Sequence, residues 1–530
     1  MLHRDCRVMI RVAALLVCCE PLMAQYDPTG PEPVGKLRGA LVLHGGGPVS
    51  EEVRETFVEL AGGTKAKISV VVADDGDGQA IEWKVAKPGS MEVVRVALPA
   101  GIVQSEMVAS LAEATGVWFQ NANPSALLAG SGGRDMEAAV RDVIQRGGVV
   151  GGTSTGIALS RFVSREDGDD RQGLDLLPGA IVAPQFLEQN SRDRLVQIVT
   201  AQPDRVGFGI PEETALILRG RKLGVIGKSE VMVILAASSQ RPVRIDRLAA
   251  GQEADLVALS RAARARSRSP FPPADPAPPQ VQSGSLVIVG GGGMPSGLVK
   301  RFIELAGGPD APLVVVPCTE QEVVLSDSFV ETLRDAGATD VSLLHTKDRR
   351  KASSDDDFLA PLKRARGIWF GGGRQWNLVD SYQNTTAHKL MHDVLARGGV
   401  IGGSSAGASI QGDYLPRGNP LGNRDIMAEG YEQGLGFLTG VAIDQHFTQR
   451  GRFADMSSLI KTYPQLLGIG IDEGTALIVR QHEAEIVGRG NVAFYDARRQ
   501  DADDDKDYVS VGAGQRFDLR SRRVVEAVRE

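Results

Sequence analysis

The chain repeats itself, and this duplication constrains its fold more than any other feature. The stretch GALVLHGGGPVSEEVRETFVELAGG at 39–63 aligns without a gap with GSLVIVGGGGMPSGLVKRFIELAGG at 284–308. A later landmark keeps the same order, since GVWF at 116–119 matches GIWF at 367–370. Each half of the 530 residues is therefore expected to form one complete domain.

Within each half, short apolar runs rich in β-branched residues alternate with stretches of helical period. Runs such as SLVIVGG and APLVVVP predict buried strands, and SGLVKRFIELAG and HKLMHDVLARG predict helices that cover them. The pattern indicates an α/β fold with a mostly parallel sheet in each half. Between the halves, the proline-rich stretch SRSPFPPADPAPPQVQSGS favours an extended spacer. We expect a first domain at 25–261, a linker at 262–283 and a second domain at 284–530.

Residues 1–24 have the features of a separate targeting segment. Three arginines precede the apolar stretch Val12–Cys19, and PLMA offers a cleavage point after Ala24, which is typical of a secretory signal peptide. We expect a secreted or periplasmic protein, with a lipoprotein as the alternative because of the Cys18–Cys19 pair. Removal of this segment leaves Cys318 as the one cysteine, so no intramolecular disulfide is expected.

The charge balance excludes some classes of partner. The chain has 59 basic and 66 acidic residues, a formal net charge of −7, and no cluster of basic and aromatic residues. Nucleic acid is therefore not expected as a partner. No stretch of about 20 apolar residues predicts a membrane span. A small-molecule or peptide substrate fits this composition better, and no cofactor is expected.

The stretch RGGVIGGSSAGASI at 397–410 contains two serines where a predicted strand turns into a helix. The small residues around Ser405 permit a sharp bend that presents its side chain outward, as in the nucleophile elbow of α/β hydrolases. Ser404 is the rival nucleophile, but an elbow needs small residues on both sides of its tip. A helix-capping serine or a phosphate-binding loop is the alternative interpretation of the same glycines.

A serine nucleophile needs a base, and the chain has only seven histidines. His388 and His392 have the spacing of a metal pair, but no third ligand accompanies them at a recognisable spacing, so no metal site is expected. Elimination leaves His446, in the segment IDQHFTQRGRF. An acid must orient the imidazole, and GIDEGTA supplies two candidates, Asp472 and Glu473.

Together these motifs resemble the cyanophycinase family. The small-residue serine elbow, DQHF followed by arginines at R-x-R, GIDEGTA, and WFGGGRQWNL at 369–378 make the second half similar to these serine peptidases, which are related to the aspartyl dipeptidase E group. The resemblance implies two tandem three-layer α/β/α sandwiches of the class I glutamine amidotransferase type. It also implies Ser405 as the nucleophile, His446 as the general base and Glu473 as its orienting acid.

The expected substrate is a β-linked aspartyl peptide, which is the class that the resemblance implies and which includes cyanophycin, a polymer of aspartate with arginine side groups. The oxyanion needs backbone donors, which Ala406 and Gly372 can supply. The free α-carboxylate of a β-linked substrate suits the guanidinium groups of Arg450 and Arg452. Asp455 stands where the family pattern has a further arginine, which widens the expectation to isoaspartyl or acidic peptides. The other expected substrate-binding residues are Asp444, Gln445 and Gln375.

The first half lacks part of this constellation. Ser154 and Glu212 survive at the positions of the nucleophile and the acid, but Gln185 stands where the base should be. FQNANPSAL at 119–127 replaces the glycine-rich loop. We expect a degenerate domain that docks on the second as a partner subunit would, or that binds polymer. A non-catalytic peptide- or polymer-binding protein on the same fold is the alternative to a serine peptidase.

Overall fold

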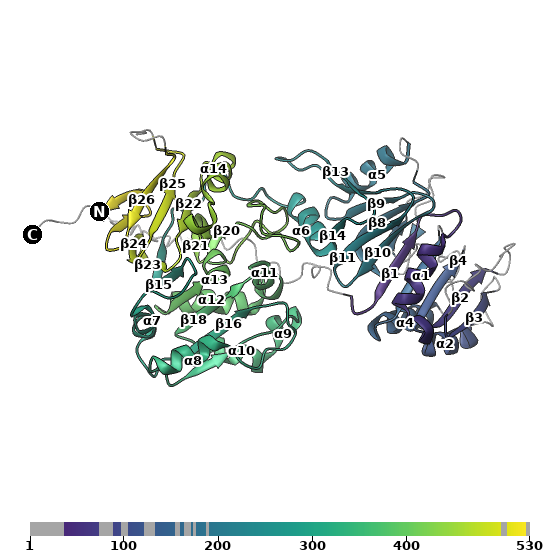
Figure 1. Ribbon diagram of the computed structural model, residues 1–530, viewed down its shortest axis with the longest axis horizontal. Coiled ribbons are helices and arrows are strands. Elements are labelled where there is room, and N and C mark those ends of the chain that lie inside the picture. Colours follow the sequence, from purple (N-terminus) through teal and green to yellow (C-terminus); the bar gives the residue numbers. More distant parts are fainter. Residues whose placement is uncertain are drawn as a thin grey trace, which may run out of the picture.

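A computed structural model of the chain arranges it as two lobes that lie side by side, with the first half on the right of Figure 1 and the second half on the left. Helix α6 (Leu256–Arg266) lies between the lobes. The described residues are 37–73, 88–96, 104–120, 133–153, 160–163, 171–172, 176–186, 190–499 and 506–525. The predicted signal peptide and Ser154 lie outside the described residues.

The first half contains two mixed sheets and their covering helices. The eight-stranded sheet has the order β14 (Glu253–Asp255), β11 (Lys222–Gly227), β10 (Thr214–Arg219), β1 (Ala40–His44), β5 (Val149–Thr153), β4 (Gly116–Gln120), β2 (Lys67–Ala73) and β3 (Ser90–Val96). The six-stranded sheet has the order β13 (Arg244–Leu248), β12 (Val231–Leu235), β9 (Val206–Ile210), β8 (Leu177–Pro184), β6 (Ser160–Val163) and β7 (Arg171–Gln172). Besides α6, the helices are α1 (Glu51–Leu60), α2 (Gln104–Glu113), α4 (Gly133–Gln145) and α5 (Asn190–Ala201).

The second half repeats this plan with a nine-stranded and a five-stranded sheet. The larger sheet has the order β17 (Val341–Leu343), β16 (Leu313–Cys318), β18 (Gly367–Gly373), β19 (Val400–Ser404), β15 (Val281–Val289), β23 (Thr475–Gln481), β24 (Glu483–Gly488), β27 (Arg516–Asp518) and β28 (Arg523–Val525). The smaller sheet has the order β20 (Gly412–Tyr414), β21 (Leu438–Gln445), β22 (Leu467–Ile471), β25 (Asn491–Tyr495) and β26 (Tyr508–Gly512). The helices are α7 (Leu298–Ala306), α8 (Ser328–Asp335), α9 (Arg349–Ser354), α10 (Asp356–Arg364), α11 (Trp376–Tyr382), α12 (Thr386–Ala396), α13 (Ala406–Ser409) and α14 (Phe453–Thr462).

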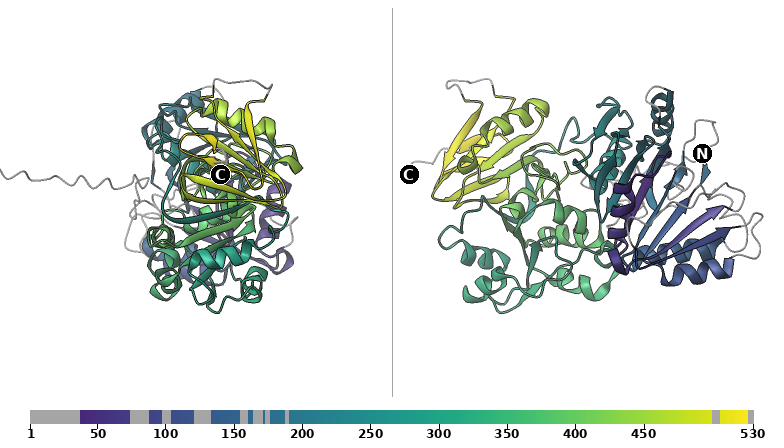
Figure 2. Two further views of the ribbon diagram at one scale, coloured as in Figure 1. Left: turned by 90° about the vertical axis from the view of Figure 1, so that its left-hand side faces the viewer. Right: turned by 45° about the vertical axis from the view of Figure 1, so that its right-hand side comes forward.

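The prediction of two tandem α/β sandwiches is confirmed, and Figure 2 shows the two lobes from further directions. The layers follow from the way successive side chains of a strand such as β15 point to opposite faces of the sheet. Its Leu286 and Ile288 belong to the core shared with the smaller sheet, whereas Val287 and Val289 belong to the core under α7 and α8. Both faces of the larger sheet are therefore buried, as a run of consecutive apolar residues predicts. The antiparallel strands β23, β24, β27 and β28, which extend this sheet, were not expected from the sequence.

The duplication extends to individual core contacts. Phe57 meets Trp118 edge to face in the first half, with ring centroids 5.1 Å apart, and Phe302 meets Trp369 in the same way at 5.2 Å in the second. The glycine beside each tryptophan leaves room for its ring, since a Cβ atom built on Gly402 would lie 2.5 Å from Trp369. The two halves therefore share a packing scheme as well as a sequence pattern.

The segment between the halves that forms neither helix nor strand is shorter than the predicted linker. Helix α6 continues to Arg266 and strand β15 begins at Val281, so both reach into the predicted linker of 262–283. Residues 267–280 form neither helix nor strand. Phe271 of this segment stacks on Tyr414 at 6.2 Å between ring centroids, so the segment packs on the second half.

No helix within the described ranges is long and apolar enough to cross a bilayer.

The turn from β19 into α13 is packed so closely that only glycine fits beside it. A Cβ atom on Gly407 would lie 2.1 Å from the Phe370 carbonyl oxygen of β18, and one on Gly403 would lie 2.3 Å from the Gly407 carbonyl oxygen. Separations under 3.0 Å are not tolerated by real Cβ atoms. The small residues of the elbow thus bring α13 directly onto the strands, and they fix the position of the residue at the tip, Ser405.

Candidate active site

Ser405 lies at the tip of the β19–α13 turn. Its backbone conformation is rare for residues other than glycine. Its φ is 55° and its ψ is −114°. The Ser405 N–H donates to the Val289 carbonyl at 3.0 Å, which ties the tip to β15. Its Oγ lies 2.9 Å from Nε2 of His446. The structure therefore brings Ser405, and not Ser404, to the histidine chosen by elimination.

The imidazole of His446 joins this serine to an acid. His446 follows β21 and also has a positive φ, 51°, with its N–H donating to the Gly290 carbonyl at 2.8 Å. Its Nδ1 lies 2.5 Å from Oε1 of Glu473. With Nδ1–H donating to the carboxylate, Nε2 is free to accept the Ser405 hydroxyl proton.

The carboxylate of the second candidate acid, Asp472, binds backbone N–H groups and not the imidazole. Its Oδ1 accepts from the Thr448 N–H and its Oδ2 from the Asn491 N–H, each at 3.1 Å. These contacts anchor the turn after His446 to the start of β25. The sequence left both acids open, and the structure turns only Glu473 toward the ring.

Burial lowers the pKa of His446 below its ordinary value of 6.5. The hydrogen bond to Glu473 opposes this effect, and the positive charges of Arg450 and Arg452 add to it. Burial therefore favours the neutral ring, which is the state a general base requires.

A glycine turn that sequence analysis did not assign to the site holds both His446 and Glu473. A Cβ atom on Gly291 would lie 2.3 Å from Cε1 of His446, and one on Gly292 would lie 2.5 Å from Oε2 of Glu473. Both glycines have positive φ, 95° and 65°. The signal was present in the sequence, because GGG follows the first strand in both halves.

The two expected oxyanion donors, Ala406 and Gly372, both lie near the serine. Ala406 N–H belongs to the first turn of α13, where N–H groups have no partner within the helix. Gly372 is the last residue but one of β18, and a Cβ atom there would lie 3.5 Å from the Cβ of Ser405. The backbone at both residues is thus close to the serine side chain.

Two of the expected substrate-binding residues are instead buried in an ion-pair network. Asp444 has no exposed surface and accepts from Arg452 Nη1 at 2.5 Å and from Arg417 Nε at 3.0 Å. Arg452 is 5% exposed and also donates to the Gln445 carbonyl at 2.8 Å. Arg417 further donates to Asp455 at 2.6 Å. The expectation that Asp444 and Arg452 face substrate is therefore corrected, because each is committed to a buried partner.

The remaining expected substrate-binding residues are divided between buried and exposed positions. Gln375 is buried and donates to the Pro416 and Arg417 carbonyls at 2.7 and 3.0 Å. Both hydrogen bonds of its amide nitrogen are therefore made to the backbone of the 416–417 segment. Gln445 is buried next to His446, and its Oε1 has no partner. Arg450 is exposed at the end of a short 3-10 turn, Thr448–Arg450. Of the two arginines predicted to bind a carboxylate, Arg450 is the accessible one.

The other residues that drew attention in the sequence have local partners. His388 and His392 both point Nε2 at the Leu435 carbonyl, at 2.9 and 2.8 Å, and burial lowers the pKa of His388 to about 3. Burial raises the pKa of the Cys318 thiol to about 12, and Sγ contacts the Arg374 carbonyl at 2.9 Å. Among the described residues, no group of three or more His, Cys, Asp or Glu side chains is arranged to hold a metal ion.

The first half retains the backbone of this site with a different side chain. Gln185 has a φ of 50°, and its N–H donates to the Gly45 carbonyl at 2.7 Å, as His446 does to Gly290. Its Nε2 donates to Oε1 of Glu212 at 3.2 Å. Gln185 therefore occupies the place of the base and binds the surviving acid, but an amide nitrogen cannot accept a proton from a serine.

Comparison with known proteins relates both halves to one family. The pattern of peptidase family S51 matches residues 90–226 and 286–487. The cyanophycinase of Geminocystis herdmanii is 31% identical over 207 residues, which are 38% of this chain and 75% of that protein. The cyanophycinase of Synechococcus elongatus is 34% identical over 207 residues, covering 38% of this chain and 63% of that protein.

A search of solved structures finds a peptidase from an acI-B1 actinobacterium that is 22% identical and covers 45% of this chain and 97% of that one, with a TM-score of 0.34. The family assignment stands on the sequence matches, which include more than half of the chain and both of its halves. The chain belongs to peptidase family S51 and is a serine-type peptidase.

Proposed function

We propose that the second half hydrolyses β-aspartyl peptide bonds, with Ser405 as the nucleophile, His446 as the general base and Glu473 as the acid that orients it. The observation that carries this proposal is the hydrogen-bonded chain of the three side chains, 2.9 Å from Ser405 to His446 and 2.5 Å from His446 to Glu473. The strained conformation of Ser405 supports it further, because such strain is concentrated at functional sites.

The chemistry follows from these positions. His446 Nε2 accepts the Ser405 proton while Oγ bonds to the substrate carbonyl carbon, and the negative charge moves to the carbonyl oxygen. The N–H groups of Ala406 and Gly372 donate to that oxygen. His446 then returns the proton to the leaving amine as the C–N bond breaks. A water molecule releases the acyl group by the same sequence of proton transfers in reverse.

The substrate class is supported by the names of the relatives and by the accessible arginine. The similar proteins from Geminocystis and Synechococcus are cyanophycinases. A β-aspartyl link leaves the α-carboxylate free, and we assign its recognition to Arg450, the exposed arginine near His446. The first half, with Gln185 in place of the base, is proposed to be non-catalytic. We also propose export from the cytoplasm, on the signal-peptide pattern at 1–24.

The linkage of the bond tests the substrate class. We expect the chain to release arginine from β-aspartyl-arginine with a kcat/KM at least ~10-fold higher than from the α-linked isomer, a difference in barrier of about 1.4 kcal/mol. Ser405→Ala should lower the rate by ~10⁴-fold, and Ser154→Ala should leave it unchanged. Equal cleavage of both isomers would contradict the β-aspartyl assignment, and loss of activity in Ser154→Ala would contradict a single site.

Neighbouring acids test the role of Glu473. Glu473→Gln should lower kcat by ~10²-fold or more at an unchanged melting temperature, because an amide no longer stabilises the imidazolium. Asp472→Asn is expected to act on stability instead, because one of two backbone N–H groups loses its acceptor at a cost of ~1–3 kcal/mol. Steady-state kinetics and thermal unfolding measure both variants. The reverse pattern would assign the orienting role to Asp472.

The pH dependence tests the role of His446. The base must be neutral, so kcat/KM should fall as pH decreases through the pKa of His446, which lies below 6.5. Arg450 lowers that pKa by its positive charge. Arg450→Gln should therefore shift the acid limb of the profile to higher pH, because the imidazolium loses a repulsive neighbour. An acid limb that stays in place or moves to lower pH would show that another group titrates.

A further inference from the structure

The chain between β20 and β21, residues 415–437, folds back on itself where the second half meets the first; we call it the bridging loop. Its two arms pair through the Leu415 N–H, which donates to the Glu432 carbonyl at 2.7 Å, and the Arg417 N–H, which donates to the Ile426 carbonyl at 2.9 Å. The inner arm is the stretch 415–417, and the outer arm is the stretch 426–433. A displacement of one arm must therefore move the other.

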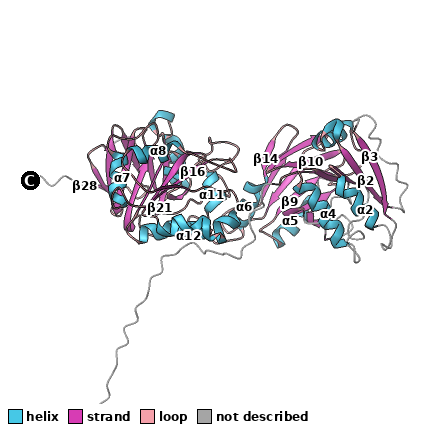
Figure 3. Ribbon diagram, turned by 90° about the horizontal axis from the view of Figure 1, so that it is seen from below, coloured by secondary structure: helices cyan, strands magenta, loops and turns pink. Residues whose placement is uncertain are grey.

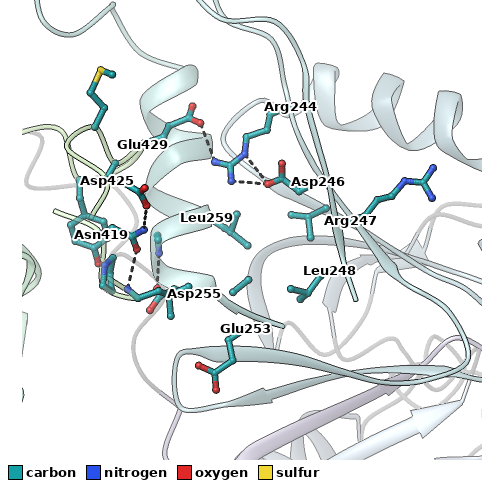
Figure 4. Close-up of a pocket in the computed structure, with 18 residues that line it drawn as sticks. Arg244, Asp246, Arg247, Leu248, Glu253, Asp255, Leu259, Asn419, Asp425 and Glu429 are labelled. Carbon is teal, nitrogen blue, oxygen red and sulfur yellow. Dashed lines mark hydrogen bonds and ion pairs between the residues drawn. The ribbon is translucent and has the colours of Figure 1, made fainter. Parts of the chain in front are cut away.

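The outer arm is held by arginines of the first half. Glu429 accepts from Arg266 at 2.5 Å and from Arg241 and Arg244 at 3.1 Å each. Figure 4 shows the Glu429 contact to Arg244 beside a cavity of about 400 Å³ that both halves line. Arg241 also donates to Glu432 at 2.6 Å. The Arg266 side chain is 4% exposed and that of Glu429 is 15% exposed, so removing one partner would leave the other charge unpaired and poorly solvated.

Helix α6 also contacts the outer arm directly, at the backbone of Gly430 and at the ring of Tyr431. Arg261 of α6 donates to the Gly430 carbonyl at 2.9 Å, and its guanidinium lies 4.8 Å from the centroid of the buried Tyr431 ring. A Cβ atom on Gly430 would lie 2.7 Å from the Ala258 carbonyl oxygen of α6. At Gly430 the loop of one half therefore lies directly against the backbone of the helix of the other.

The inner arm supports the candidate active site. The Pro416 and Arg417 carbonyls accept both donors of the Gln375 amide, two residues beyond the glycines of β18. The Arg417 guanidinium binds Asp444, two residues before His446, and Asp455 at the start of α14. The first half thus reaches the surroundings of Ser405 through the outer arm and then the inner arm.

We propose that the degenerate first half is a built-in positioning subunit, which holds the bridging loop against the active site so that the second half can bind a peptide. The proposal rests on the proposed function. Ser405 and His446 themselves are tied to β15 and the glycine turn by the bonds to the Val289 and Gly290 carbonyls. Loosening the loop should therefore weaken binding of an extended substrate and leave the chemical step in place.

Arg241→Gln in the full chain tests this dependence, because it removes contacts to Glu429 and Glu432 from a residue remote from Ser405. We expect KM for a β-aspartyl peptide to rise about tenfold and kcat to stay within about threefold. Hydrogen exchange at residues 414–433 should be faster than in the original chain, because the arms separate more often. Arg241→Lys retains the charge and should recover part of both effects.

The matched control is Lys222→Gln, since Lys222 is exposed and pairs with Glu253 of its own half at 2.9 Å. It should change neither KM nor exchange at 414–433. The proposal is overturned if Arg241→Gln behaves like this control, or if it lowers kcat with KM unchanged. If the original chain cleaves no β-aspartyl peptide, the proposed function fails, and the exchange comparison still decides whether the first half holds the loop.

Discussion

The sharp turn at Ser405 is the constraint on which the rest of the second half depends. A positive φ at a residue with a Cβ atom costs about 1–3 kcal/mol and persists only where the surroundings enforce it. Here Gly403 and Gly407 let α13 lie against the Phe370 carbonyl, and β15 holds the tip through Val289. The strain therefore directs the hydroxyl out of the sheet and toward the imidazole.

The two halves keep the same backbone geometry at corresponding positions with different side chains. Gln185 retains the positive φ, the backbone hydrogen bond and the contact with an acid that belong to His446 in the other copy. One substitution removes the proton acceptor without disturbing the turn. The first half also contacts the second directly, because three of its arginines, Arg241, Arg244 and Arg266, surround Glu429.

Local motifs and the family resemblance indicated which residues to place at the candidate site, but not the residues that support them. Ser405, His446 and Glu473 each lie in a short segment where composition alone indicates a turn at a strand end, and the duplication gave the domain plan. Arg452 was expected to face substrate because nothing local reveals that Asp444 neutralises it. Arg417, 27 residues from Asp444 in the chain, could not be recognised from any motif. Buried ion pairs of this kind depend on tertiary contacts that a single sequence does not encode in its spacing.

The central claim is that one serine, at one strained turn, carries the chemistry of the whole chain. The direct measurement is reaction of the full chain with a small fluorophosphonate at neutral pH, followed by peptide mapping in a mass spectrometer. The account predicts a single adduct on Ser405, since its hydroxyl alone among the described serines lies at hydrogen-bond distance from a histidine that is paired with an acid. An adduct on Ser404 or Ser154, or peptide hydrolysis that survives without any adduct, would contradict it.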